Sequence, residues 1–197
     1  MTEPEPAGSV RAIYAGPWRI DLTDRPGVAR LLPWRVLARL AAAALVAARA
    51  PRPASIGLIL AGDAELAALN ARHLGKAGPT DVLSFPLLSP AVFLPRPGRT
   101  RPDVPGAPGA RPSGPDFVLP PGRRIHLGDI IVSVERAVEQ ARAGRGGQTG
   151  DVHWSAADEL RLLVVHGTLH VCGWDHAEPA DERAMRALEQ RLLAGGR

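Results

Sequence analysis

Apolar residues along this chain gather in short strand-like runs that alternate with stretches of helical spacing. The runs ASIGLILAG, TDVLSFPLL and IHLGDIIVS, which begin at residues 54, 80 and 125, are rich in apolar, β-branched or hydroxyl residues and predict strands. RAIYAGPWRIDL, which begins at residue 11, contains Ile, Tyr and Trp and predicts a first strand. Together these runs indicate a small sheet.

Segments with helical spacing lie between the predicted strands. The first runs from 27 to 50, with Pro33 as a candidate boundary between two helices. A second helix, AELAALNARHL, is expected after Asp63 as its N-cap and is stopped by Gly75. A third, VERAVEQARAG, follows directly on the last predicted strand.

Two further helices are predicted near the C-terminus. Ser155 and Asp158 form a capping-box pair in front of LRLLVVHGTLHVC, and Gly173 ends that helix. Pro179 opens the last helix, which places Met185, Leu188 and Leu192 on one face and pairs Glu182 with Arg186 on another.

Strands and helices are mixed without strict alternation, which predicts the α+β fold class, with a small mixed sheet packed against helices. A chain of 197 residues is long enough for one substantial core, so we expect a single domain over residues 11–197. Residues 1–10 are predicted to be a disordered tail. The stretch at about 90–122 is dominated by Pro, Gly and Arg and is predicted to be a mobile insertion.

Composition narrows the functional classes. Lys and Arg exceed Asp and Glu by 24 to 20, which favours polyanionic partners only weakly, because a net charge of +4 also describes an ordinary solvated surface.

The single cysteine, Cys172, excludes an internal disulfide and fits a cytoplasmic protein. MTEPEPAGSV lacks the features of a signal peptide, and the longest apolar run, at 37–50, is too short and too charged to cross a bilayer.

Three of the six histidines lie between residues 166 and 176. His166 and His170 are four apart on a predicted helix, so their imidazoles can share one metal ion. Gly173 ends the helix and lets the chain turn back, so that His176 supplies a third nitrogen. Each histidine alone would more often be an ordinary helix or loop residue, but this spacing predicts one Zn²⁺ with its fourth position open, as in catalytic zinc sites.

Neighbouring residues refine this prediction. Cys172 is two residues from His170 on a helix and should point away from the ion. Metalloproteases with a His-Glu-x-x-His motif use the glutamate as general base, and here Gly167 occupies its place. Asp175 either has a functional role, in which it orients a ligand or accepts a proton, or caps the turn, and the sequence leaves both interpretations open.

The segment VVHGTLHVCGWDH resembles the YbeY family, bacterial metal-dependent endoribonucleases that act in ribosomal RNA maturation. Two more segments, GKAGPTDVLSFP and LGDIIVSVERA, are similar to family sequences in the expected order, and the resemblance spans most of residues 11–194. It implies an α+β fold, zinc held by the three histidines, and RNA as substrate, with no role for DNA. The small ribosomal subunit or its assembly proteins are the implied partners. The motif positions are His166, Gly167, His170, Gly173, Asp175 and His176.

The resemblance also yields candidates for the rest of the site. Asp175 and Lys76 are the catalytic candidates, and the substrate-binding candidates are Arg72, Thr80, Asp81 and Ser84. Family members carry an arginine where this chain has Leu74, so Arg72 or Lys76 is expected to supply the positive charge. The competing interpretation of Arg72 is a solvated position on the helix. Thr80, Asp81 and Ser84 can equally be explained by turn capping and strand pairing.

The insertion at about 90–122 is a second departure from the family. Its arginines either contact phosphate or reflect compositional bias. His126 is interpreted as a lone surface histidine. The flanking and internal arginines in question are Arg96, Arg99, Arg101, Arg111, Arg123 and Arg124.

The predicted function is therefore a zinc-dependent endoribonuclease directed at single strands. Two alternatives remain open at this point. One is a zinc-dependent protease or amidase, and the other is a ribosome-assembly binding protein in which the zinc is structural.

Overall fold

The computed structural model describes residues 10–93, 124–144 and 154–195. The predicted N-terminal tail, apart from residue 10, lies outside the described residues, and so does most of the predicted insertion. The division into one domain with a tail and an insertion therefore remains a prediction.

Five strands of the described chain form one mixed sheet in the order β1-β2-β3-β5-β4. β2, β3 and β5 run parallel, whereas the two edge strands, β1 and β4, are each antiparallel to their neighbour. The strands span Val10–Ala15 (β1), Trp18–Asp24 (β2), Ala54–Ala61 (β3), Val82–Pro86 (β4) and Ile125–Ser133 (β5).

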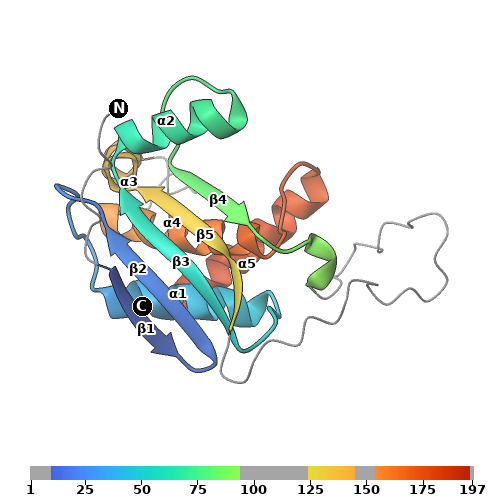
Figure 1. Cartoon of the computed structure of the whole chain (residues 1–197). Coiled ribbons are helices and arrows are strands. Elements are labelled where there is room, and N and C mark those ends of the chain that lie inside the picture. The colour runs from blue at the N-terminus through green and yellow to red at the C-terminus, as the bar shows by residue number, and fades with distance from the viewer. Residues whose placement is uncertain (1–9, 94–123, 145–153, 196–197) are drawn as a thin grey trace.

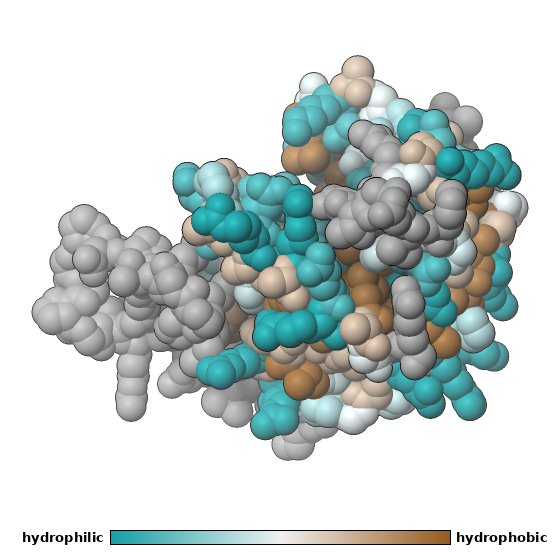
Figure 2. Space-filling view, turned by 180° about the vertical axis from the view of Figure 1, so that it is seen from behind, coloured by the Kyte–Doolittle hydropathy of each residue, from teal (hydrophilic) through white to brown (hydrophobic). Residues whose placement is uncertain are grey.

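The helices are distributed unequally over the two faces of the sheet (Figure 1). One face carries α1 (Trp34–Ala47), α4 (Ala156–Val171) and α5 (Pro179–Gly195), with α3 (Val134–Arg142) packed beside α4. On the other face, α2 (Asp63–Leu74) packs over one end of the sheet, against β4 and β5. A single 3-10 turn, Pro90–Val92, follows β4. Figure 2 views the multi-helix layer from outside, where hydrophilic residues cover most of the coloured surface. The α+β prediction is confirmed.

The main core lies between the sheet and the layer of α1, α4 and α5. Alternate residues of the strands point into it, because successive side chains of a strand face opposite sides. β3 is buried along nearly its whole length, as its apolar sequence predicts. Fully buried members include Ile20, Leu22, Leu37, Leu45, Ile56, Leu58, Leu160 and Leu169. Within the described residues, no helix is both long and apolar enough to cross a membrane.

Two predictions for the N-terminal region are wrong. RAIYAGPWRIDL forms two strands, β1 and β2, joined by a turn in which Gly16 adopts φ 61°, a left-handed conformation that glycine tolerates. Only one helix forms between 27 and 50, because Pro33 stands at the N-cap of α1 and the residues before it are not helical. Proline fits the start of a helix but not its interior.

Asp63 is the first residue of α2 rather than its N-cap, and it connects α2 to α3. Its backbone N–H donates to Glu135 Oε2 at 2.6 Å, and its carboxylate accepts a hydrogen bond from Ser133 Oγ at 2.6 Å. The same carboxylate lies 3.1 Å from Arg136 Nε. The predicted stop at Gly75 is confirmed by a φ of 65°.

The N-terminus of α4 is fixed by the predicted capping box. Ser155 Oγ accepts from the Asp158 N–H at 3.2 Å, and the Asp158 carboxylate accepts from the Ser155 N–H at 3.1 Å. At the other end, Gly173 takes φ 73° directly after the C-cap. The helix is thereby held at both ends, and this helix carries two of the clustered histidines.

Removal of the cap should destabilise the protein measurably. Ser155→Ala leaves one backbone N–H without its acceptor and is expected to lower the free energy of unfolding by about 1 kcal/mol. Ser155→Thr retains the hydroxyl and should keep most of the stability. Urea denaturation of both variants measures the effect, and equal losses in the two would contradict a capping role.

Candidate metal centre

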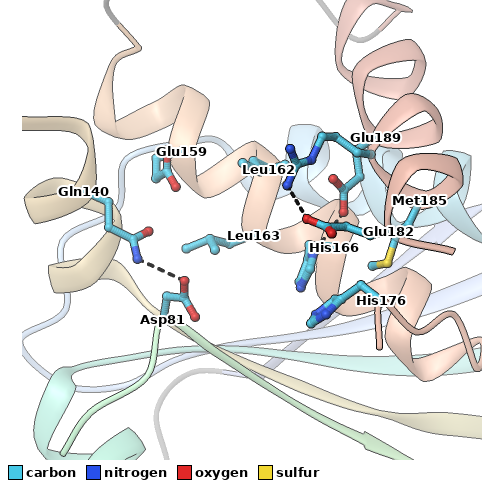
Figure 3. A pocket seen from close by; sticks show the side chains of 11 residues that line it. Asp81, Gln140, Glu159, Leu162, Leu163, His166, His176, Glu182, Met185 and Glu189 are labelled. Carbon is cyan, nitrogen blue, oxygen red and sulfur yellow. Dashed lines mark hydrogen bonds and ion pairs between the residues drawn. The ribbon is translucent and has the colours of Figure 1, made fainter. Parts of the chain in front are cut away.

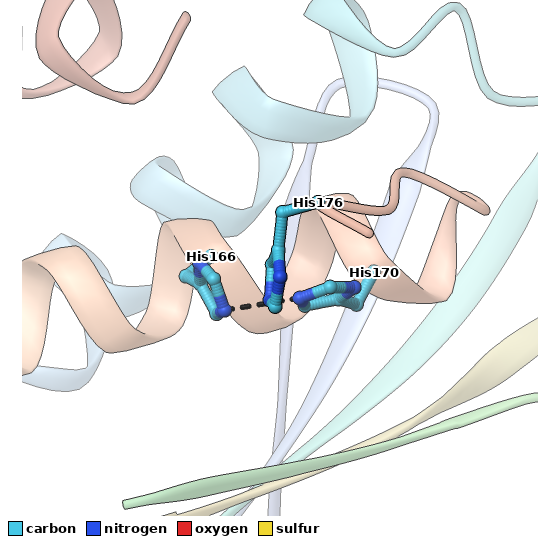
Figure 4. Close-up of side chains that lie close together, drawn as sticks. All are labelled: His166, His170 and His176. Carbon is cyan, nitrogen blue, oxygen red and sulfur yellow. Dashed lines mark hydrogen bonds between the residues drawn. The ribbon is translucent and has the colours of Figure 1, made fainter. Parts of the chain in front are cut away.

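The three clustered histidines converge on one point (Figure 4). His166 and His170 project from successive turns of α4, and His176 reaches them from the loop after the helix. One ligand atom from each imidazole can be chosen so that all three lie within 4.8 Å of one another. The ring centroids are 4.5 to 5.6 Å apart. The arrangement can hold a single metal ion.

The other ring nitrogens of the two helical histidines are hydrogen-bonded to acceptors. His166 Nδ1 lies 2.8 Å from Glu189 Oε1, and His170 Nδ1 lies 2.8 Å from the carbonyl oxygen of Trp174. Because these partners accept, each Nδ1 carries the proton in the neutral ring and each Nε2 presents a lone pair. The two Nε2 atoms are only 3.0 Å apart. A bound cation suits this donor set, since it satisfies both lone pairs at once.

The electrostatic environment of His170 keeps its ring neutral. Burial, first of all, lowers the pKa of His170 from its ordinary 6.5 to about 4. The imidazoles of His166 and His176 act in the same direction, while the Trp174 carbonyl and the Asp175 carboxylate oppose them. A neutral imidazole is the form that binds metal.

The loop after α4 brings His176 back to the helix. Gly173 occupies the left-handed region at φ 73°, and a Cβ there would come within 2.9 Å of the Pro90 side chain, so the turn accepts only glycine. Asp175 Oδ1 accepts the His176 N–H at 2.7 Å. Cys172 is fully buried in the core and is not one of the clustered ligands.

The helix is seated against the sheet by its glycine. A Cβ on Gly167 would lie 2.6 Å from Ile130 Cγ2 and 3.0 Å from Val82 Cγ2. Ser84 Oγ donates to the Gly167 carbonyl at 3.1 Å, which joins β4 to α4. Any side chain at this position would point into β4 and β5 rather than toward the histidines, so the general base of a His-Glu-x-x-His protease has no room here.

A cleft of about 410 Å³ opens beside the histidines, between α4, α5, α3 and the start of β4 (Figure 3). His166 and His176 line one end of it. The charged residues that line the cleft are mostly acidic. Arg186 is the one Lys or Arg among them, and it pairs with Glu182 at 2.6 Å. The lining suits a cation better than a polyanion. Its carboxylates come from Asp81, Glu159, Glu182 and Glu189.

The structure brings only some of the sequence-predicted polar residues to this cleft. Asp81 lines it, with Oδ2 accepting from Gln140 Nε2 at 2.9 Å and Oδ1 accepting from the Val82 N–H at 2.9 Å. Thr80 Oγ1 donates to the same Oδ1 at 3.2 Å, so Thr80 orients Asp81. Ser84, as described, bonds to the helix backbone.

Arg72, Leu74 and Lys76 do not line the cleft. All three are exposed, at the last turn of α2 and in the loop that follows, and Leu74 is 56% exposed. His126 is not a lone histidine as predicted, since its ring bonds Ser55 Oγ at 3.0 Å and Asp129 Oδ1 at 3.1 Å on the face opposite the main core.

Sequence reasoning missed Glu189 as the partner of His166. Glu189 is only 8% exposed and lies in α5 beside the buried Leu188, one turn after the buried Met185. A carboxylate at a position of the helix that is otherwise apolar is the signal that could have identified it, because a buried charge requires a partner.

Known proteins are similar to this chain over most of its length. A family model described as Endoribonuclease YbeY matches residues 34–196. The Endoribonuclease YbeY of Thermobifida fusca is 39% identical over 162 residues, which cover 82% of this chain and 84% of the relative. That of Salinispora tropica is 41% identical over 145 residues, covering 73% and 75%. A solution structure of a Thermotoga maritima protein aligns with a TM-score of 0.49 and 21% identity over 91% of this chain and 88% of that one.

Glu189 is expected to strengthen metal binding by orienting His166. Glu189→Gln keeps the shape but weakens the acceptor, and removal of such an outer partner typically lowers metal affinity about 10- to 100-fold. Competition with a chromophoric chelator measures the affinity. Glu182→Gln, a carboxylate of the same cleft paired with Arg186, is the matched control and should bind metal as the wild type does. Wild-type affinity in Glu189→Gln would exclude the role.

His170 should make the metal-free protein sensitive to acid. Its pKa is about 4 in the folded chain against 6.5 for the free side chain, so its contribution is complete above about pH 6.5 and is lost as the pH falls toward 4. Between pH 7 and pH 4.5, the chelator-treated wild type should lose about 2 kcal/mol more than His170→Gln. Urea denaturation at both pH values tests this, and parallel losses would contradict it.

Proposed function

The chain belongs to the YbeY endoribonuclease family, and from that premise we propose that it is a zinc-dependent endoribonuclease that cleaves single-stranded regions of ribosomal RNA. The observation that carries the proposal is the convergence of three histidines on one point beside a cleft. The enzyme acts in the cytoplasm during ribosome maturation. Its partners are the small ribosomal subunit or the proteins that assemble it, and it has no DNA substrate.

The metal ligands are His166, His170 and His176. When bound, zinc polarises a phosphoryl oxygen and acidifies water. The protein prepares the ligands beforehand: Glu189 and the Trp174 carbonyl hold the two Nδ1–H groups, so both Nε2 atoms face the ion position. Half-burial of these rings limits the reorganisation needed on binding.

Asp175 and Lys76 are the proposed catalytic residues outside the ligand set. Asp175 is exposed, adjoins His176 and interacts electrostatically with His170, so its carboxylate accepts a proton at the edge of the centre. Lys76 and Arg72, both exposed near the C-terminal end of α2, contribute positive charge to the RNA phosphates in place of the arginine that Leu74 replaces.

The polar residues around β4 have more than one proposed role. Asp81, held by Thr80 and Gln140, lines the cleft, where its carboxylate accepts from a hydroxyl or amino group of the substrate and not from a phosphate. Ser84 acts through its hydrogen bond to Gly167, which fixes the position of α4. A protease is disfavoured because Gly167 stands in the place of the catalytic glutamate and packs against Ile130.

Removal of one ligand or of the metal should abolish RNA cleavage. Purified wild type and His170→Ala are incubated with ribosomal RNA and with a random peptide pool, with and without chelator, after bound metal has been quantified. We expect chelator-sensitive RNA cleavage that zinc restores and that falls at least about 100-fold in His170→Ala, with peptides left intact.

Other outcomes would replace the proposal. RNA cleavage that is equal in wild type and His170→Ala would identify a contaminant. Peptide cleavage would indicate a protease. Bound zinc with neither activity would favour the structural zinc of an assembly protein, and cobalt substitution would then show a closed fourth position.

A further inference from the structure

A second hollow lies at the edge of the sheet opposite the metal centre. It is a groove of about 1280 Å³ between β1, the turn that follows β1, and α1. The metal centre adjoins β4, which is the other edge strand, so β2, β3 and β5 lie between the two sites. With strands spaced about 4.8 Å apart, the edges are separated by about 19 Å.

The charged side chains of this groove are all arginines, and all are exposed. Arg30 is paired with Asp24. In the described part of the chain, the other three have no carboxylate within ion-pair distance. Arg35 and Arg39 are one turn apart on the same face of α1, whose first turn contains no acidic residue and whose N-cap provides no side-chain hydrogen bond. The unneutralised helix N-terminus adds to the positive potential. The four residues are Arg11, Arg30, Arg35 and Arg39.

Aromatic rings stand among these arginines. The Arg11 and Arg30 guanidinium groups lie 5.5 and 4.9 Å from the Trp34 ring centroid, which orders both side chains. Tyr14 lines the same groove and is 61% exposed, with the Arg124 guanidinium 5.4 Å from its ring centroid. An exposed ring beside a row of cations is the arrangement by which single-stranded nucleic acid is bound through stacking and phosphate contacts.

The charge distribution of the whole molecule favours a polyanion in this groove. The cleft at the metal centre is lined mostly by carboxylates and therefore repels phosphate except at the ion itself. We infer that the β1–α1 groove binds the phosphate backbone of single-stranded RNA, with Tyr14 stacking on a base, several nucleotides away from the bond at the metal centre. This inference rests on the proposed function, because it makes the groove a second contact for the same RNA.

The separation of the two sites sets a length requirement. A stacked strand advances about 3.4 Å per nucleotide, so at least about six nucleotides are needed to cover 19 Å. A tetranucleotide at the metal centre cannot reach the groove, whereas a 20-nucleotide strand can occupy both.

The binding test uses full-length His170→Ala with chelator present, so that RNA is not cut, and a fluorescein-labelled, unstructured 20-nucleotide RNA followed by anisotropy. Adding Arg35→Glu and Arg39→Glu should weaken binding at least tenfold and lower the slope of log affinity against log salt by about 1.4, because each lost contact removes about 0.7. The control pair, Arg142→Glu and Arg191→Glu, makes the same charge change at exposed positions outside the groove and should weaken binding less than threefold.

Substitutions of Tyr14 test base stacking separately from charge, because they change RNA affinity without changing the charge of the groove. Tyr14→Ala should weaken binding about five- to tenfold or more through lost stacking, whereas Tyr14→Phe should bind as Tyr14 does. Equal affinity of the alanine and phenylalanine variants would overturn the stacking contact. Equal losses in the groove pair and the control pair would overturn the site. Tighter, groove-dependent binding of a 12-residue polyglutamate peptide would overturn RNA as the occupant and identify an acidic peptide instead.

Cleavage separates this inference from the proposed function. In otherwise wild-type protein, the groove pair should lower kcat/KM for the 20-nucleotide RNA at least tenfold and leave that for a tetranucleotide unchanged. Cleavage of the long RNA with unchanged kcat/KM would overturn the groove while leaving the proposed function intact. Groove-dependent RNA binding in a protein without any nuclease activity would support the groove and overturn the proposed nuclease function.

Discussion

The close approach of α4 to the sheet at Gly167 is the contact on which the metal centre depends. With hydrogen as the only side chain, the helix backbone lies against Ile130 and Val82, and Ser84 Oγ reaches the Gly167 carbonyl. This contact fixes both the depth and the rotation of the helix. The glycine lies one residue after His166 and three residues before His170. Both histidines are therefore directed toward α5 and the loop that follows α4. A methyl group at residue 167 would displace both histidines together.

The sequence was a good guide where one local signal determined the outcome. The strands at 54, 80 and 125, the capping box at Ser155 and the stop at Gly173 each follow from side chains within a few residues, and the structure has them. It was a poor guide where two signals competed. The Gly-Pro pair at 16 and 17 forms a turn that divides the predicted strand into two. Asp63 interacts with Ser133 and Arg136 instead of capping α2.

The site shows the same division. The spacing of the three histidines and the turn at Gly173 are properties of one continuous segment, so their convergence could be predicted. Glu189 and the tie from Ser84 come from elements that meet α4 only through tertiary packing. No spacing rule connects residue 166 to residue 189, and only the burial of a carboxylate in an amphipathic helix could have drawn attention to it. Ser55, one partner of His126, was missed for the same reason, since it lies on a neighbouring strand.

The three clustered histidines also differ in how firmly they are held. The rings of His166 and His170 are half-buried and braced at Nδ1, whereas His176 is exposed in the loop between Gly173 and Pro179, and no hydrogen bond braces its ring in the described chain. A metal ion bound here would be held by His166 and His170 from the helix and by His176 from the loop. The two helical imidazoles are already oriented by their Nδ1 partners, whereas the orientation of the third depends on the conformation of the loop. A substitution in the loop would therefore alter one of the three nitrogens and leave the other two in place.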